Sequence, residues 1–184
     1  LVWKTNFGCR SCPAVFDGRV FIINRAGAGK PSEQERVMCL DANTGKVIWE
    51  DRFNVYLTNI PNSRVGWANI LVDPETSYVY AHGVGGVFRC YDRDGKIIWS
   101  RSLTEELGRL SGYGGRTNSP NIAGDLLVIS FTNSHWGPFN LPAIVVWINK
   151  LTGEIVYVAQ PGGKFKNSTY STVVVANHGG MQLV

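Results

Sequence analysis

Residues 40–49 read Leu-Asp-Ala-Asn-Thr-Gly-Lys-Val-Ile-Trp, and residues 87–99 and 144–157 repeat the same pattern. The turn glycines of the three copies, Gly45, Gly95 and Gly153, are 50 and then 58 residues apart. Self-similarity at such a spacing is typical of proteins built by stacking one supersecondary unit many times. The repeat is therefore the feature from which the rest of the chain is interpreted.

Each copy of the pattern predicts a tight turn between two strands. An Asp or Asn ends the first strand and can accept backbone N–H bonds across the turn, while the glycine supplies the positive φ that closes it. A large flat ring then stands at one place on the second strand, which suits packing between adjacent sheets. The repeated motif residues are Asp41, Gly45, Trp49, Asp92, Gly95, Trp99, Asn149, Gly153 and Tyr157.

A second pair of short strands precedes each copy, so each unit has four strands, which we call A to D in chain order. Stacking such sheets radially solves the problem of their exposed edges, as a β-propeller does. We predict an all-β fold, a β-propeller of four-stranded antiparallel blades, with three full blades and two partial ones in this segment. The expected blades are residues 11–52, 68–101 and 117–158, and the partial blades are residues 1–5, at a strand D position, and 170–184. We expect the remaining blades to belong to the same parent chain.

Composition and charge agree with this class and exclude others. The 184 residues include 44% hydrophobic and 17% charged residues and 21 glycines, which fits a turn-rich β protein and argues against disorder or a coiled coil. The net charge of +4 is too mild to indicate nucleic-acid binding. The longest uncharged run, residues 126–149, holds Asn, Gly and Pro residues in its middle, so no transmembrane segment is predicted.

Residues 40–49 resemble the PQQ-like (pyrroloquinoline-quinone-type) β-propeller repeat, whose pattern is an aspartate, a Thr-Gly-Lys turn and a docking tryptophan. The second copy lacks one turn residue and the Thr, and the third replaces both the Asp and the Trp. The family includes periplasmic quinoprotein dehydrogenases, the propeller lipoprotein of the outer-membrane protein assembly machinery, and secreted propellers. The resemblance implies a bacterial protein that is periplasmic or secreted.

The cysteines and histidines favour structural roles. Cys9 and Cys12 form an isolated Cys-x-x-Cys without the partners that zinc, haem or thioredoxin-like chemistry needs, so a disulfide in the turn or a buried thiol is expected. Cys39 and Cys90 share one place on successive C strands and should fill the interior. Three histidines fall at different points of their blades, which argues against a shared metal site: His82, His135 and His178.

Connection lengths divide the predicted blades into two faces. The A–B and C–D turns are short and form what we call the short-turn face. The B–C and D–A connections are long and form the long-loop face; they cover residues 24–36, 52–66, 101–116, 131–142 and 158–169. These five segments carry a formal charge of +6 and several aromatic residues, a combination that recurs at protein interfaces. The candidate partner-binding residues are Arg25, Lys30, Arg36, Arg109, Tyr113, Arg116 and Trp136.

One pair of acidic residues and one glycine-rich stretch are further candidates for a site. Glu105 and Glu106 are adjacent and follow Ser102, a pattern typical of a short capped helical turn rather than an acid/base pair. Residues 108–116 are rich in glycine but do not form a phosphate-binding motif. They are either an inter-blade loop or a ligand or partner loop.

The sequence thus favours a non-catalytic extracytoplasmic scaffold for protein–protein binding or assembly, with a protein partner in the cell envelope. We predict no catalytic residue, no metal site and no cofactor. One alternative is part of a quinoprotein dehydrogenase that binds pyrroloquinoline quinone and calcium. Another is a module that binds carbohydrate or an anionic polymer in the funnel of the propeller.

Overall fold

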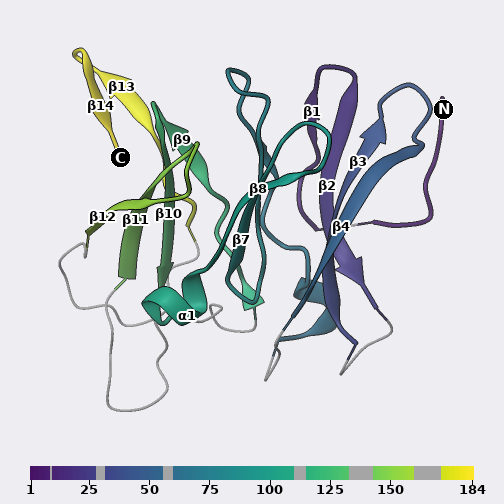
Figure 1. The fold of residues 1–184 in the computed structure, drawn as a ribbon, viewed down its shortest axis with the longest axis horizontal. Coiled ribbons are helices and arrows are strands. Elements are labelled where there is room, and N and C mark those ends of the chain that lie inside the picture. The colour runs from purple at the N-terminus through teal and green to yellow at the C-terminus, as the bar shows by residue number, and fades with distance from the viewer. Residues whose placement is uncertain (9, 28–31, 56–59, 110–114, 133–142, 160–170) are drawn as a thin grey trace.

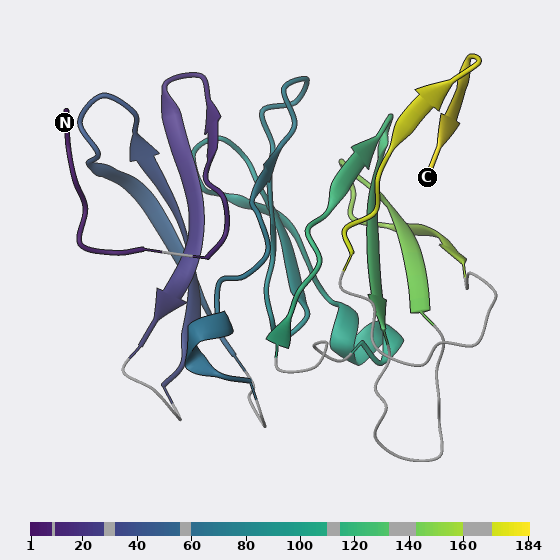
Figure 2. The same cartoon turned by 180° about the vertical axis from the view of Figure 1, so that it is seen from behind.

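The fold consists of antiparallel sheets stacked side by side (Figures 1 and 2). A computed structural model describes residues 1–8, 10–27, 32–55, 60–109, 115–132, 143–159 and 171–184. It contains three four-stranded sheets and a two-stranded hairpin, so the predicted all-β class with four-stranded antiparallel blades is confirmed. In the described chain the strands of each sheet follow one another in sequence order.

The first sheet contains β1 (Ala14–Phe16), β2 (Arg19–Ala26), β3 (Gln34–Asp41) and β4 (Val47–Asn54). The second contains β5 (Leu71–Val72), β6 (Val79–His82), β7 (Val87–Tyr91) and β8 (Ile97–Ser102). The third contains β9 (Asn121–Ala123), β10 (Leu126–Thr132), β11 (Ala143–Asn149) and β12 (Ile155–Ala159). The hairpin of β13 (Ala176–His178) and β14 (Met181–Leu183) lies beside the third sheet, and two short helices, η1 (Asn62–Arg64) and α1 (Leu103–Leu107), lie on the connections (Figure 1).

The three repeated turns join strand C to strand D in every sheet, as predicted. Asp41 Oδ1 accepts the N–H groups of Asn43 and Thr44, and the Asp92 and Asn149 side chains accept equivalent bonds. The turn glycines have φ values of 69°, 89° and 75° for Gly45, Gly95 and Gly153. The conformation that these glycines were predicted to supply is therefore present at all three turns.

An indole ring links each sheet to the next by one repeated contact. Trp49 of the first sheet donates from Nε1 to the carbonyl of Arg93, 2.9 Å away, in the C–D turn of the second. Trp99 makes the same bond, 3.1 Å long, to the carbonyl of Lys150 in the third sheet. Each ring covers the turn glycine that follows: a Cβ built on Gly95 or Gly153 would lie 2.6 Å from the ring. Glycine is thus required both for its φ and for the close approach of the ring.

Residues 1–5 differ in part from the expectation, because they form no strand. Trp3 nevertheless takes the docking position: its Nε1 donates to the carbonyl of Ala42, 2.8 Å away, and its ring lies 2.6 Å from a Cβ built on Gly45. Trp3 and Phe7 pack against Ile22, Met38 and Leu40 of the first sheet. At the other end Tyr157 occupies the same repeat position but is 60% exposed.

A chain of hydrogen bonds links the segments that lead into the first strands of the sheets. The N–H of Cys12 donates to Asn69 Oδ1, the N–H of Asn69 to Ser119 Oγ, and the N–H of Ser119 to Thr172 Oγ1, over 2.8, 2.9 and 3.3 Å. The same repeat position therefore bridges four successive units. Because Thr172 takes this position after Ser119, residues 171–173 correspond to the beginning of a fourth unit.

The apolar core lies between the sheets rather than within any one of them. One buried cluster joins residues of the second and third sheets, among them Tyr80, Trp99 and Ile129, and another joins the first and second. Cys39 and Cys90 are buried in these clusters as unpaired thiols, as predicted. Because each sheet buries its faces against its neighbours, the sheets depend on one another for stability.

Candidate functional site on the long-loop face

The long-loop face carries η1, α1 and the B–C and D–A connections, opposite the hairpin turns (Figure 1). The strands reach further into it than the sequence suggested. β2 runs to Ala26 and β3 begins at Gln34, so Arg25 and Arg36, predicted to lie in a loop, are strand residues. The B–C connection of the second sheet is a short turn of residues 83–86. Among the described residues this face therefore includes strand ends and a short turn as well as connections.

Several arginines that contribute to the predicted positive charge form ion pairs within the chain. Arg25 pairs with Glu33, which is buried, and also donates to it from Nη2 over 2.9 Å. Arg36 donates to Asn24 Oδ1 over 3.0 Å and lies 3.7 Å from Glu50. Both arginines therefore have intramolecular contacts that a partner would have to share or replace.

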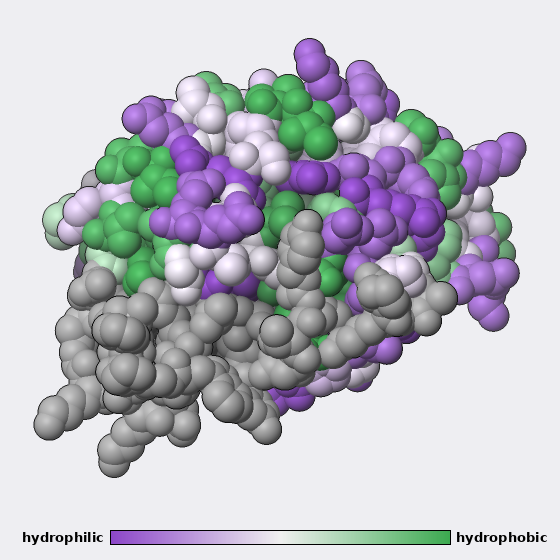
Figure 3. Space-filling model, turned by 60° about the horizontal axis from the view of Figure 1, so that its bottom comes forward, coloured by the Kyte–Doolittle hydropathy of each residue, from purple (hydrophilic) through white to green (hydrophobic). Residues whose placement is uncertain are grey.

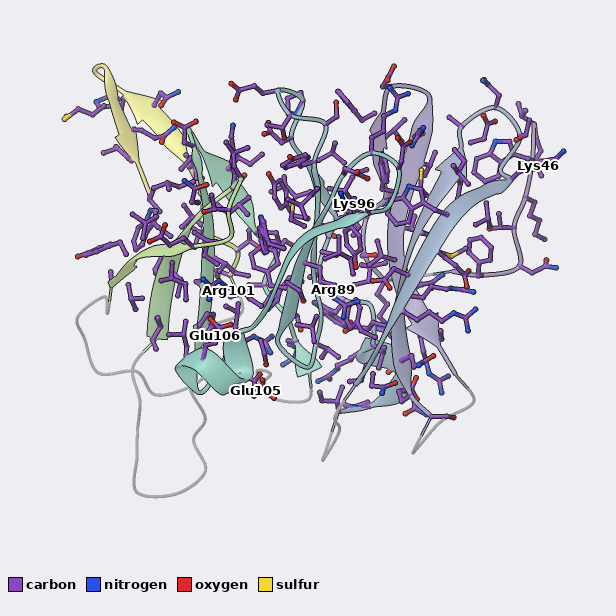
Figure 4. The ribbon with its side chains drawn as sticks, in the orientation of Figure 1. Lys46, Arg89, Lys96, Arg101, Glu105 and Glu106 are labelled. Carbon is purple, nitrogen blue, oxygen red and sulfur yellow. The ribbon has the colours of Figure 1, made fainter. Side chains whose placement is uncertain are left out.

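Arg52 and Arg101 are engaged in the same way. Arg52 pairs with Glu50 over 2.7 Å, and Arg101 pairs with Glu106 over 2.5 Å. Figure 4 shows Arg101 near Glu106 at α1, with Lys46 and Lys96 nearer the short-turn face. Glu50 lies on β4, outside the five predicted segments, so its negative charge is not included in the formal charge of +6. The charge that this face presents is therefore lower than +6.

Arg109 is the predicted contact residue whose position differs most clearly from the expectation. Its side chain is 1% exposed, so it cannot contact a partner in this conformation. Its Nη1 donates to the carbonyl of Val84 over 3.0 Å, and its backbone N–H donates to the carbonyl of Leu103. The sequence placed Arg109 in a glycine-rich loop, which gave no signal that the guanidinium would turn inward.

A buried carboxylate, Glu35, lies beside Arg109. Glu35 is 1% exposed and accepts the N–H of Gly66 over 2.9 Å and the N–H of Val84 over 2.9 Å to Oε2. Burial raises the pKa of Glu35 to about 7, although these two N–H groups and Arg109 pull it back down. Burial likewise lowers the pKa of Arg109 to about 10.

His82 is enclosed in the interior and bonded to a backbone carbonyl. It is fully buried at the end of β6, and its Nδ1 lies 3.0 Å from the carbonyl of Asn118. A carbonyl accepts, so Nδ1 carries the proton of the neutral ring. Burial lowers the pKa of His82 well below its ordinary value. Ser130, at the same repeat position, donates in the same way to the carbonyl of Ser171.

The sequence did not single out an aromatic and arginine cluster on the first D–A connection. Trp67 lies between η1 and β5 and is partly exposed. The guanidinium of Arg10 lies 5.5 Å from its ring centroid and that of Arg64 lies 5.9 Å away. These residues come from two segments that are distant in sequence, so no local pattern could have predicted the cluster. Both guanidinium groups lie within the distance of about 6 Å at which a cation is attracted to the face of an indole ring.

The structure describes some of the remaining predicted residues and not others. Arg116 is half-buried. Glu105 and Glu106 lie on α1, where the Ser102 side chain accepts the Glu105 N–H and caps the helix, as predicted. His178 is exposed on β13 and Cys12 is exposed before β1. The predicted residues outside the described ranges are Cys9, Lys30, Tyr113, His135 and Trp136.

Across the described residues, no three or more His, Cys, Asp or Glu side chains come together as a possible metal site. The described helices are also too short or too polar to cross a membrane. Hydrophilic and apolar patches are interleaved on the part of the surface shown in Figure 3, where the long-loop face is turned toward the viewer.

Comparison with protein families identifies one match over nearly the whole chain. A family model described as outer membrane protein assembly factor BamB matches residues 1–180. No curated protein matches the chain significantly.

Solved structures share the fold at low sequence identity. A europium-containing methanol dehydrogenase superposes with a TM-score of 0.59 at 16% identity, covering 82% of this chain and 24% of its own. The quinohemoprotein alcohol dehydrogenase ADHIIG from Pseudomonas putida HK5 gives 0.54 at 21% identity, covering 85% and 21%. BamB from Moraxella catarrhalis gives 0.52 at 16% identity, covering 86% and 42%. The chain therefore spans less than half the length of each of these proteins.

Proposed function

The chain belongs to the PQQ-like β-propeller repeat family whose model is described as outer membrane protein assembly factor BamB, and from this premise we propose that it is a binding scaffold for a protein of the bacterial cell envelope. The family match over residues 1–180 is the observation that carries the proposal. A periplasmic or secreted location for the whole protein is part of this proposal, and the family match supports it. The chain itself supplies a rigid stack of blades on which connections present contact groups.

We place the contact surface on the long-loop face. Short hairpins offer little adaptable surface, whereas this face presents Arg64 and the half-buried Arg116. Trp67 adjoins it in sequence, and both Arg64 and Arg10 lie over the Trp67 ring. Aromatic and arginine side chains are enriched at protein interfaces. An acidic surface on the partner would complement these arginines. Lys30, Tyr113 and Trp136 complete the predicted contact set.

A charge-reversal experiment tests which face is used. The long-loop variant combines Arg10→Glu with Arg116→Glu. The matched short-turn variant combines Lys46→Glu with Lys96→Glu, two exposed lysines at the C–D turns (Figure 4). Each variant would be crosslinked to proteins of an envelope extract across a salt series, and the recovered species would be identified and quantified.

We expect the long-loop variant to reduce recovery of the wild-type partner at least about tenfold, because charge pairs across an interface control both encounter and specificity. Recovery by wild type should fall as salt rises, since charges more than about 8 Å apart are largely screened at 0.15 M. Equal loss in both variants, or salt-independent recovery, would contradict the choice of face.

The dehydrogenase alternative rests on the solved structures with the same fold. In that alternative pyrroloquinoline quinone would supply the redox chemistry and calcium would need six to eight oxygen ligands. The described residues hold no cluster that fits calcium. Adding the quinone and calcium and measuring dye-linked alcohol oxidation tests it, and stoichiometric uptake with turnover would favour this alternative over the scaffold.

A further inference from the structure

Two arginines from separate segments meet at one indole ring. The guanidinium carbon of Arg10 lies 5.5 Å from the ring centroid of Trp67, and that of Arg64, the last residue of η1, lies 5.9 Å from it. Arg10 is exposed, and Trp67 and Arg64 are partly buried. Since the ring attracts both cations, two positive charges are held at a single place. We call these three residues the Trp67 cluster.

The backbone on both sides of Trp67 is fixed by buried contacts. The N–H of Gly66 donates to Glu35 Oε1 over 2.9 Å. A Cβ built on Gly66 would lie 2.7 Å from the Cα of Asn24, so the chain packs directly on β2 at this point. Ala68, on the other side of Trp67, is 2% exposed. The indole is therefore held on a base that needs neither arginine.

The segment that carries Arg10 is joined to the segment that carries Trp67. The N–H of Cys12 donates to Asn69 Oδ1 over 2.8 Å. Arg10 and Trp67 each lie two residues before this bonded pair, so they occupy the same repeat position in adjacent units. The hydrogen-bond chain that aligns the units therefore also brings the Arg10 side chain to the ring.

The positive charge of Arg10 has no carboxylate partner within the chain. All 14 Asp and Glu residues lie in the described ranges, and none of them forms an ion pair with Arg10. The arginines that do form ion pairs are Arg19, Arg25, Arg36, Arg52, Arg89, Arg93 and Arg101. Arg10 can thus bind an external carboxylate without first breaking an internal ion pair.

A carboxylate on a short aliphatic stem fits both kinds of contact that the Trp67 cluster offers. A guanidinium group binds a carboxylate through two parallel N–H···O bonds. The indole offers apolar surface to the methylene groups of the stem. Because two guanidinium groups share the ring, a segment with more than one acidic side chain complements the cluster better than a single charge does.

We propose that the Trp67 cluster binds a segment of the partner protein that carries acidic side chains. Arg10 binds a carboxylate directly, Arg64 supplies the second positive charge, and the Trp67 ring positions Arg10 and contacts the stem of the acidic side chain. This assignment rests on the proposed function, because it assumes a protein partner, and it names the chemical group by which that partner is recognised. Binding of a peptide with this chemistry can be measured without the partner.

Titration of the 184-residue chain with short peptides tests the assignment. One blocked peptide alternates Glu and Ser, a control peptide has Gln in place of every Glu, and inorganic phosphate is the third probe. Binding would be followed by ¹H–¹⁵N NMR at the indole Nε1–H of Trp67, whose signal is identified by its loss in Trp67→Phe. The titrations would be repeated on Arg10→Gln and Arg64→Gln. The matched control is Arg52→Gln, a change of an exposed arginine that pairs with Glu50.

We expect the Glu peptide to shift the Trp67 indole signal and the Gln peptide to leave it in place. Arg10→Gln should raise the dissociation constant of the Glu peptide at least about tenfold, the factor that one hydrogen bond to a charged group supplies. Arg52→Gln should leave this constant unchanged. If Arg64→Gln does not fold, Arg10→Gln decides, because Arg10 is exposed.

Three results would overturn the assignment to an acidic segment. The first is an indole signal that does not respond to the Glu peptide or responds equally to the Gln peptide. The second is an equal loss of affinity in Arg10→Gln and Arg52→Gln. The third is phosphate that binds as tightly as the Glu peptide, which would indicate a site for free anions.

The peptide titrations and the crosslinking experiment can fail separately. If the titrations meet these expectations and crosslinking recovers no envelope protein, the proposed function fails and the peptide site remains. If crosslinking recovers a partner that the Glu peptide does not displace, the role of the Trp67 cluster fails and the proposed function remains.

Discussion

At the scale of single residues, the indole and the turn glycine act as one unit that spans two sheets. Trp49 stacks on Tyr91 at 5.5 Å between ring centroids and bonds the carbonyl of Arg93. Trp99 occupies the same place one unit later but is almost fully buried. The repeat therefore preserves a contact between blades, with the two partners about 50 residues apart.

Trp49→Ala is expected to cost about 3 kcal/mol of unfolding free energy, the lower end of the range for large aromatic truncations, because Trp49 is only half-buried. Trp99→Ala should cost more, toward about 5 kcal/mol, because its ring is enclosed between the second and third sheets. Urea denaturation of both variants measures this order. A loss below about 1 kcal/mol for Trp99→Ala would show that the ring does not connect the sheets.

Gly95→Ala separates backbone strain from the docking contact. The new methyl group would meet a positive φ of 89° and the ring of Trp49 at 2.6 Å. Gly124→Ala is the matched control, since Gly124 also has a positive φ, 60°, but nothing lies within 4 Å of its Cβ. We expect Gly124→Ala to cost about 1 kcal/mol, from strain alone, and Gly95→Ala at least twice that. Equal changes in the urea midpoint of the two variants would show that the contact with the Trp49 ring adds nothing to the cost of backbone strain.

At the scale of elements, charged pairs on the short-turn face fasten neighbouring sheets. Between the first and second sheets Asp17 pairs with Arg93 and Arg19 with Asp94, both on an exposed surface. Between the second and third, Lys150 is buried and lies 3.2 Å from Asp73 and 2.6 Å from Glu75. Arg93 and Lys150 occupy one repeat position, so the same junction exists in an exposed and a buried form.

Lys150→Met is expected to cost about 3–5 kcal/mol, because it leaves the buried Asp73 without its cation. Arg93→Met, the equivalent change at the exposed junction, should cost less than about 1 kcal/mol. Chemical denaturation of both variants measures the difference. Adding Asp73→Asn to Lys150→Met should recover part of the loss, and a double variant no more stable than Lys150→Met would argue that the lysine acts through packing alone.

At the scale of the whole molecule, the blade architecture could be predicted because each blade repeats one local turn. The backbone and packing requirements of Asp41, Gly45 and Trp49 can be recognised within ten residues of sequence. The inward turn of Arg109 could not be predicted, since it depends on Glu35 and Val84, which are 74 and 25 residues away. The Trp67 cluster was missed for the same reason. The contacts of Arg109 and Trp67 are not repeated from one described blade to the next, so the sequence alone does not place them.

Stability as a function of pH joins the buried groups to the whole fold. The pKa of Glu35 is raised by burial from 4.5 to about 7, so between these values the folded chain binds more protons than the unfolded chain. The contribution of Glu35 to stability is therefore fully present below about pH 4.5 and is lost as pH rises through 7. His82, whose pKa is lowered by burial, acts in the opposite direction: its contribution is present above about pH 6.5 and is lost as pH falls.

Because these two contributions oppose each other, the total profile of wild type does not isolate either. The difference in unfolding free energy between wild type and Glu35→Gln does, since only Glu35 is removed. As pH rises from 5 to 8, the unfolding free energy of wild type is expected to fall relative to that of Glu35→Gln by at most about 3 kcal/mol, the free energy that corresponds to the raised pKa. Urea unfolding at half-unit pH intervals measures it, with Glu105→Gln, a change of an exposed glutamate on the same face, as the control. A flat difference for Glu35→Gln would mean that Glu35 stays ionised in the folded chain throughout this range, and that Arg109 and the two N–H groups outweigh the cost of its burial.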